Sequence, residues 1–397
     1  MLFIAEAVTL AHVGRTIELA KSLHARGTEV VLACDPRFAS FLRDLPFQVV
    51  SVQSIPAATF LKALSRGTPV YREADLLRYA ADDLALIGTH GPDAVVGDFR
   101  LSLSASARHA GVPYVNVTNA YWSLYAQPDF EVPSFPATRW LGLALTQAAF
   151  RVLRPLAFAA HAAPLNRVRR HYGLAPLVRD VRAAYTDGDL VLYADIPEMV
   201  PLDGPPAHHR FIGPVLWSPP VDRPSWWDAA LGGAAPIYVT MGSSGDAGRL
   251  PTFVDALLPL GKPIVVATDG RGAPLPARPG VWSAPFLPGQ DIAARASAVV
   301  CNGGSPTAQQ ALVEGVPVIG IASNLDQFLN MHYVERFGAG VRLRADRVKP
   351  PAIRDAVESV LNDPTVRASA QAAAALAAKT RSTDAFPASI AALVRRG

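Results

Sequence analysis

Short apolar segments alternate with helical stretches along the first third of the chain. Leu2–Val8, Glu29–Ala33, Asp93–Gly97 and Pro113–Thr118 have the length and apolar character of buried strands, and Gly14–Arg26 carries apolar residues at helical spacing. A repeated strand–helix–strand order predicts a parallel sheet with right-handed crossovers. We therefore expect a doubly wound α/β domain at the N-terminus.

The alternation restarts after a stretch rich in proline and tryptophan. Strands are predicted at Ile237–Met241, Pro263–Thr268, Ala298–Cys301 and Val316–Ile321, which indicates a second α/β domain. The predicted organisation is an N-terminal domain over 1–217, a linker over 218–236, a C-terminal domain over 237–380 and a last helix over 381–397 that packs back on the first domain.

Composition and charge exclude several classes of protein. The net charge is only +4 and the basic residues are dispersed, so we expect no nucleic-acid partner. Two separated cysteines favour neither disulfides nor a zinc cluster, which is typical of the cytoplasm. The apolar stretch from Trp140 to Leu165 contains Arg151, Arg154 and Pro155, so it fits a buried or interfacial helix better than a membrane span.

The most informative segment runs from Val299 to Val341. A strand is predicted to end at Cys301, two glycines (Gly303 and Gly304) make a turn, and a helix is predicted to begin at Thr307. Backbone N–H groups at a helix start bind anions, and glycines let a diphosphate approach the chain closely. Ser305 and Thr307 add hydroxyl donors. Without the rest of the segment, an ordinary strand-to-helix turn that binds no phosphate is the alternative.

The wider segment resembles the nucleotide-sugar signature of bacterial and plant glycosyltransferases that make natural-product glycosides, including macrolide- and rhamnolipid-type relatives. The matching residues are Gly303, Gly304, Thr307, Ala311, Leu312, Gly315, Val316, Pro317, Asp326, Gln327, Asn330, Gly338 and Gly340. The resemblance implies the GT-B fold, two Rossmann-like domains with a cleft between them, and a donor that is a UDP- or dTDP-sugar.

Three positions depart from that signature. Asn302 stands where the family has a diphosphate-binding histidine, Pro306 replaces a glycine, and Gln310 replaces the glutamate that binds both ribose hydroxyls. Because an amide has only one acceptor end, Gln310 weakens the case for uridine over thymidine nucleotides.

The resemblance assigns further donor residues. Asp326 and Gln327 are expected to hold sugar hydroxyls, with a solvated loop pair as the alternative. The loop after Ile237–Met241, with Ser243 and Ser244, would lie under the phosphates. The nucleobase would pack beside Phe286, for which a core role is the alternative, and Leu287 would offer backbone polar groups to the edge of the base.

The resemblance also implies a catalytic pair in the N-terminal domain. His12 is expected in the loop ahead of a helix that begins at Gly14, in a stretch where the family reads G-H-x-x-P and this chain has Arg15 in place of the proline. Asp98 follows the predicted strand Asp93–Gly97, at the same sheet edge as His12. The implied roles are general base for His12 and orienting carboxylate for Asp98.

Aromatic residues are concentrated where acceptor-binding loops are expected. Tyr121, Trp122 and Trp140 are candidates to line an apolar acceptor pocket, with a core role as the alternative for each. We therefore expect an inverting, metal-independent glycosyltransferase that needs no cofactor beyond its nucleoside diphosphate sugar, acts on a small apolar acceptor, and is a monomer or homodimer. The alternatives are a lipid glycosyltransferase in peripheral contact with a membrane surface and a non-catalytic activator protein.

Overall fold

The computed structural model describes residues 1–272 and 275–395, which divide into two compact units. Unit 1 comprises Met1–Gln127, Gln147–Val215 and the chain from Thr380 onward. Unit 2 comprises Pro128–Thr146 and Leu216–Lys379.

Unit 1 is built on a parallel sheet of seven strands among the described residues, in the order β3-β2-β1-β4-β5-β6-β7. The strands are β1 (Leu2–Ala5), β2 (Val31–Cys34), β3 (Gln48–Ser51), β4 (Val95–Asp98), β5 (Tyr114–Thr118), β6 (Leu190–Tyr193) and β7 (His209–Phe211). The order steps outward from β1 in both directions, as in doubly wound folds, which confirms the predicted fold class for this half of the chain.

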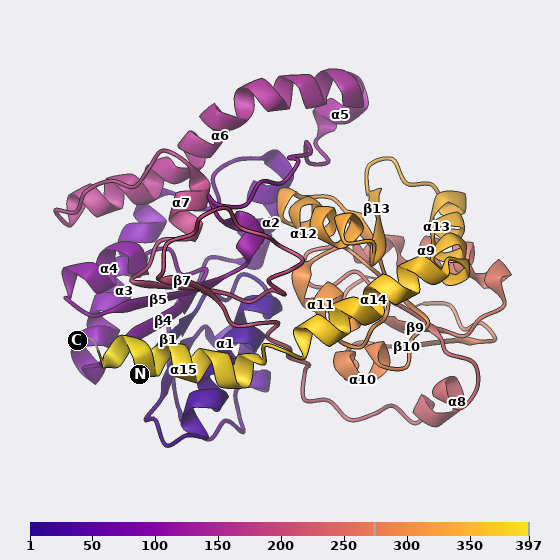
Figure 1. Ribbon diagram of the computed structural model, residues 1–397, viewed down its shortest axis with the longest axis horizontal. Coiled ribbons are helices and arrows are strands. Elements are labelled where there is room, and N and C mark those ends of the chain that lie inside the picture. The colour runs from indigo at the N-terminus through magenta and orange to yellow at the C-terminus, as the bar shows by residue number, and fades with distance from the viewer. Residues whose placement is uncertain (273–274, 396–397) are drawn as a thin grey trace. The chain divides into compact units, whose positions relative to one another are not determined.

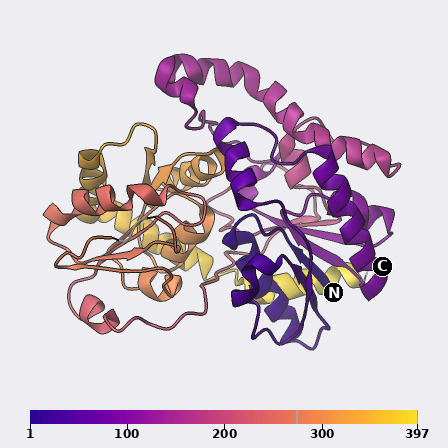
Figure 2. The ribbon, with the colours of Figure 1, turned by 180° about the vertical axis from the view of Figure 1, so that it is seen from behind.

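Helices cover both faces of this sheet, because alternate residues of each strand point to opposite faces. The helices are α1 (Leu10–His24), α2 (Ala57–Arg66), α3 (Glu73–His90), α4 (Leu103–His109), α6 (Leu143–His171, which begins in unit 2), α7 (Val181–Tyr185) and α15 (Ser382–Val394). Leu2 and Ile4 of β1 pack with α3 and α4, whereas Phe3 packs against Phe386 of α15. In Figure 1, α15 lies in front of this sheet, and in Figure 2, from behind, violet helices lie in front of it.

Unit 2 is built on a second parallel sheet, of six strands in the described residues, in the order β10-β9-β8-β11-β12-β13. Its strands are β8 (Ile237–Thr240), β9 (Ile264–Ala267), β10 (Val281–Ala284), β11 (Ala298–Cys301), β12 (Val318–Ala322) and β13 (Gly340–Arg344). Its helices are α5 (Pro136–Trp140), α8 (Trp227–Leu231), α9 (Leu250–Leu257), α10 (Gly289–Ala293), α11 (Ser305–Val313), α12 (Leu325–Arg336), α13 (Pro350–Asn362) and α14 (Pro364–Ala377).

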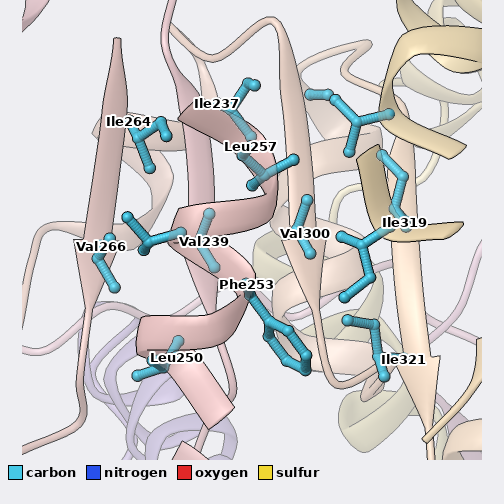
Figure 3. Close-up of a cluster of buried hydrophobic side chains, with 14 of the residues drawn as sticks. Ile237, Val239, Leu250, Phe253, Leu257, Ile264, Val266, Val300, Ile319 and Ile321 are labelled. Atoms are coloured by element: carbon cyan, nitrogen blue, oxygen red, sulfur yellow. The ribbon is translucent and has the colours of Figure 1, made fainter. Parts of the chain in front are cut away.

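The core of unit 2 shows how the strand pattern produces a buried layer. Leu250, Phe253 and Leu257 recur at helical spacing along α9 and are fully or almost fully buried. Figure 3 shows these side chains packed over aliphatic residues from four neighbouring strands, β9, β8, β11 and β12. Strands buried on both faces consist almost entirely of apolar residues, which is why the sequence predicted most of this sheet.

The segment 128–146 differs from its predicted placement, since it groups with unit 2 and not with the rest of 1–217. Polar contacts account for the difference. The guanidinium of Arg344 in β13 donates to the carbonyl of Val132 (2.9 Å), and the hydroxyl of Thr138 donates to Asp346 (2.6 Å). These partners lie more than 200 residues apart in the chain, so no local pattern could reveal them.

Candidate active site

His12 and Asp98 meet at the carboxyl edge of the unit 1 sheet. The helix α1 begins at Leu10, so His12 lies in its first turn and not in a loop, and Asp98 is the last residue of β4 and not the residue after it. Ring nitrogen Nδ1 of His12 lies 2.8 Å from Oδ1 of Asp98. The His12 side chain is 20% exposed and that of Asp98 only 2%.

The hydrogen bond to Asp98 fixes which nitrogen of His12 can act on a substrate. A carboxylate accepts at Nδ1, so a neutral ring carries its proton there and presents Nε2 as the acceptor. The ring of Phe99 stacks on that of His12, with centroids 5.0 Å apart and planes within 6°. Phe99 adopts a φ of 60°, a strained conformation for a non-glycine residue that is often found at functional sites.

A second side chain of α1, Arg15, binds the same carboxylate. Its Nε donates to Oδ2 of Asp98 (2.5 Å) and its Nη2 to Oδ1 (2.8 Å), while Nη1 donates to Oδ1 of Asn119 (3.0 Å). The binding of Asp98 by Arg15 was not predicted from the sequence. The available signal was the spacing, because residues three apart on a helix share one face.

The residue after Phe99, Arg100, is the centre of a buried ionic network. Arg100 is fully buried, donates from Nη1 to Glu6 (3.2 Å) and from Nε to Asp83 (3.0 Å), and lies over the ring of Tyr79. Burial raises the pKa of Glu6 and of Asp83, although the charge of Arg100 opposes the shift. These contacts anchor the residue next to Phe99 and thereby hold the unusual backbone in place.

A row of aromatic side chains extends from Phe99 within unit 1. Tyr185 contacts Phe99 (centroids 5.1 Å apart), and Trp122 contacts Tyr185 (5.0 Å). Of the three predicted acceptor residues, only Trp122 joins this row. Tyr121 is 1% exposed and belongs to the core, and Trp140 belongs to α5 of unit 2, where it is 86% exposed.

In unit 2 the glycine turn leads into a helix at the position expected for diphosphate binding. The helix α11 begins at Ser305, two residues before the predicted start, with Gly304 as its N-cap. Pro306 therefore lies in the first turn, where proline is favoured because its missing N–H would have no partner in the helix. Gly303 has a φ of 80°, and a Cβ there would come within 2.7 Å of Met331.

Ser244, Asn302 and Gln327 are brought together beside this turn. The amide nitrogens of Asn302 and Gln327 donate to the hydroxyl of Ser244 over 3.0 Å and 3.3 Å, and the oxygen of Asn302 accepts from the N–H of Gly304 (3.1 Å). Ser243 adjoins Ser244 in the same loop after β8. Asn302 thus organises the turn in the absence of the family histidine.

Asp326 and Gln327 lie in the first turn of α12 and not in a loop. Gln327 is 1% exposed, and its amide oxygen accepts from the backbone of Ser323 and Asn324, forming a capping box with Asn324. The alternative of a solvated loop pair is therefore wrong for Gln327. Asp326 is half-buried.

The remaining predicted donor residues line other parts of unit 2. The amide nitrogen of Gln310 donates to the carbonyl of Trp217 (2.6 Å) and the hydroxyl of Ser218 (3.3 Å). Leu287 is buried and Phe286 is half-buried near Gly270. Thr307 lies in the first turn of α11 and is half-buried.

Known proteins share this sequence and fold. Residues 252–393 match the family described as erythromycin biosynthesis protein CIII-like, C-terminal domain. A PGL/p-HBAD biosynthesis rhamnosyltransferase of Mycobacterium bovis is 47% identical over 377 residues, covering 95% of this chain and 83% of that protein. A PGL/p-HBAD biosynthesis glycosyltransferase of Mycobacterium tuberculosis is 45% identical, covering 94% and 87%. The chain belongs to this family of glycosyltransferases.

The fold of this glycosyltransferase matches solved GT-B structures over its whole length. The glycosyltransferase VinC, solved in complex with dTDP, superposes with a TM-score of 0.69 at 19% identity, covering 100% of this chain and 99% of that one. The superposition confirms the predicted GT-B fold, and the family membership confirms the predicted enzyme class.

Proposed function

We propose that this glycosyltransferase moves a deoxyhexose of the rhamnose kind from a dTDP-sugar to the hydroxyl of a phenolic or lipid-like acceptor, with inversion and with His12 as general base. The hydrogen bond between His12 and Asp98, which directs Nε2 toward an acceptor, carries the proposal. The related rhamnosyltransferase and the dTDP complex of VinC support the choice of sugar and nucleotide.

The donor is held by unit 2 in this proposal. The first-turn N–H groups of α11 face the diphosphate, and the positive end of the helix dipole offsets the charge that develops on the leaving group. The hydroxyl of Ser244, held by Asn302, adds a polar contact beneath the phosphates. Asp326 and Gln327 at the start of α12 would bind the sugar hydroxyls.

The orientation of Gln310 supports a thymidine nucleotide. Its amide nitrogen already donates to Trp217 and Ser218, so in this proposal the amide oxygen, which lies near Gly289, is the end that accepts from the nucleotide. A single acceptor suits the single ring hydroxyl of a deoxyribose nucleotide, whereas a carboxylate would bind the two hydroxyls of ribose. Phe286 and Leu287 would pack against the base.

The acceptor is held by unit 1. The half-buried aromatic rings of Phe99, Tyr185 and Trp122 form a row that begins at His12. Such a row suits an aromatic or aliphatic acceptor better than a polar sugar. This agrees with relatives that act in PGL/p-HBAD biosynthesis.

In the reaction, the acceptor oxygen attacks the anomeric carbon as its proton passes to Nε2 of His12. The bond from the anomeric carbon to the diphosphate oxygen breaks, and dTDP leaves with that electron pair. Attack opposite the leaving group inverts the configuration. Asp98 keeps the Nδ1 proton in place and stabilises the imidazolium that forms.

The substitution His12→Ala tests this assignment. A general base contributes about 10²–10⁴-fold to turnover, so turnover should fall by that factor while dTDP affinity, measured by titration calorimetry, is retained. Retention of more than about a tenth of wild-type turnover would refute the role of His12. Absence of dTDP binding to wild-type protein would refute the donor assignment.

A membrane-surface site for the same reaction is favoured by one observation. In the unit 1 part of α6, Val152, Leu153 and Leu156 are 75%, 54% and 69% exposed. Arg151 is exposed beside them, and α6 contains no acidic residue. None of the described helices is both long and apolar enough to cross a bilayer, so the contact would be interfacial.

Vesicle cosedimentation tests the membrane contact. The double change Leu153→Asp and Leu156→Asp should abolish binding to anionic vesicles, and added salt should weaken wild-type binding. The control is Val394→Asp, because Val394 is an exposed apolar residue of α15. Equal binding by both variants would exclude α6 as the contact.

A further inference from the structure

Arg15 occupies a position that the family motif gives to proline. It lies one helical turn after His12, on the same face of α1. A proline inside a helix removes a hydrogen bond and clashes with the preceding turn, so it is tolerated only at the helix start. With arginine at this position, α1 extends back to Leu10 and includes His12 in its first turn.

The guanidinium of Arg15 is fixed on two sides. Two of its nitrogens bind the two oxygens of Asp98 (2.5 and 2.8 Å), which is the bidentate geometry in which arginine–carboxylate pairs are strongest. The third donates to Asn119, whose amide nitrogen in turn donates to Asp195 (2.9 Å). The Arg15 side chain is only 12% exposed.

Asp98 therefore serves two partners at once. Its Oδ1 accepts from His12 and from Arg15, and its Oδ2 accepts from Nε of Arg15. Burial by itself would raise the pKa of Asp98, but the charge of Arg15, followed by that of His12, lowers it overall. The carboxylate therefore remains ionised near neutral pH, paired with a permanent cation.

We infer that Arg15 is a positioning residue, which fixes the plane of the Asp98 carboxylate and offsets its charge. As a result, Asp98 orients His12 with a carboxylate that is already paired with a permanent cation. The inference rests on the proposed role of His12 as general base. It assigns a function to the residue in which this chain departs from the family motif.

Two other acidic groups near this site have hydrogen-bonding partners of their own. Glu6, which follows β1, interacts electrostatically with His12, but its carboxylate is paired with Arg100. Asp195, which follows β6, accepts from Asn119 and from the backbone N–H of Ala120. Arg15 is thus the cation that directly contacts the His12 partner, Asp98.

Three variants separate charge from geometry. Arg15→Gln removes the charge, Arg15→Lys keeps the charge but loses the bidentate fork, and Arg26→Gln removes an arginine that pairs with Asp384 at the surface. The protonation of His12 is followed by NMR of histidine-labelled protein, with its signal assigned from His12→Ala. The pH dependence of kcat/KM and the affinity for dTDP are measured alongside.

In Arg15→Gln the uncompensated charge of Asp98 should move the midpoint of the His12 NMR titration upward. The acid limb of kcat/KM should move with it, and dTDP affinity should not change. Arg15→Lys should keep the wild-type midpoint but lose about tenfold or more in kcat, because the carboxylate plane is released. Arg26→Gln should match wild type.

An unchanged midpoint in Arg15→Gln overturns the charge role, and wild-type kcat in Arg15→Lys overturns the positioning role. If Arg15→Gln does not fold, Arg15→Lys still tests the positioning role. The NMR midpoint is independent of catalysis. A shifted midpoint in Arg15→Gln together with an active His12→Ala would therefore reject the proposed base while retaining the electrostatic effect of Arg15.

Discussion

Replacing Asp98 by asparagine separates its effect on stability from its effect on the reaction. The side chains of Asp98 and Arg15 are 2% and 12% exposed, so the change leaves a buried guanidinium facing a neutral amide. Removing one partner of a buried ion pair costs about 3–5 kcal/mol. Because asparagine retains one acceptor oxygen, we expect a loss in the free energy of unfolding near the lower end, about 3 kcal/mol.

The loss of turnover should be a separate effect from the loss of stability. An asparagine can present its N–H₂ group to the His12 ring and so favour the wrong tautomer. We expect kcat to fall by about 10²–10⁴-fold. Affinity for dTDP should persist, because the predicted donor residues all lie in unit 2.

The control is Asp384→Asn, which removes a carboxylate from a surface pair with Arg26 whose members are 66% and 44% exposed. An exposed pair contributes about 0–1 kcal/mol. Urea unfolding, turnover and dTDP calorimetry are measured on both variants. Equal stability losses in the two variants, or an active Asp98→Asn enzyme, would refute the reasoning.

The pH dependence of that stability difference has a definite sign. Asp98 has a lowered pKa in the folded protein, after the charges of Arg15 and His12 outweigh the effect of burial. Its contribution is therefore complete above the unfolded value of about 3.9 and is lost as the pH falls through the lower folded value. The gap between wild type and Asp98→Asn should be constant near neutral pH and shrink only in acid.

Three further predictions concern the donor half. Gln310→Glu should shift the ratio of UDP to dTDP affinity about tenfold toward UDP, since a carboxylate accepts from two hydroxyls; calorimetry with both nucleotides showing an unchanged ratio would contradict this. Gly303→Ala should weaken dTDP binding and lower stability by at least about 1 kcal/mol, because φ is positive there and the added Cβ would meet Met331 at 2.7 Å; thermal unfolding like that of wild type would argue against it. Turnover should survive EDTA if the α11 dipole offsets the leaving-group charge, and a loss reversed by added magnesium would show otherwise.

The sequence predicted strands that are buried along their whole length and missed edge strands such as β3 and β10. β8, β9, β11 and β12 are buried along their whole length, so their composition alone indicates a strand in a covered sheet. β3 and β10 lie at the edges of the two sheets, and their residues are half-buried or exposed. An edge strand need not be apolar on both faces, so no continuous run of apolar residues indicated β3 or β10.

The candidate site was predictable only where a motif or a sheet edge determined it. His12 and Asp98 were placed at one edge because parallel strands end there together, and the structure joins them by a hydrogen bond. Arg15 and Gln327 were harder, since their roles depend on partners 83 residues away or on a capping geometry. The start of α11 was misplaced because Ser305 and Pro306 resembled a turn more than a first helical turn.

Three of the positions that depart from the family motif have a specific partner within their own unit. Arg15 binds Asp98, Asn302 binds Ser244 and the backbone of Gly304, and Gln310 binds Trp217. A site that had lost its function would have no reason to retain such partners, because unused polar groups drift without cost at a surface and are costly when buried. Asn302 and Gln310 are both buried, and the amide nitrogen of each donates a hydrogen bond within unit 2. We therefore expect an altered donor and base geometry at these positions, and their contacts favour the glycosyltransferase over a non-catalytic activator protein.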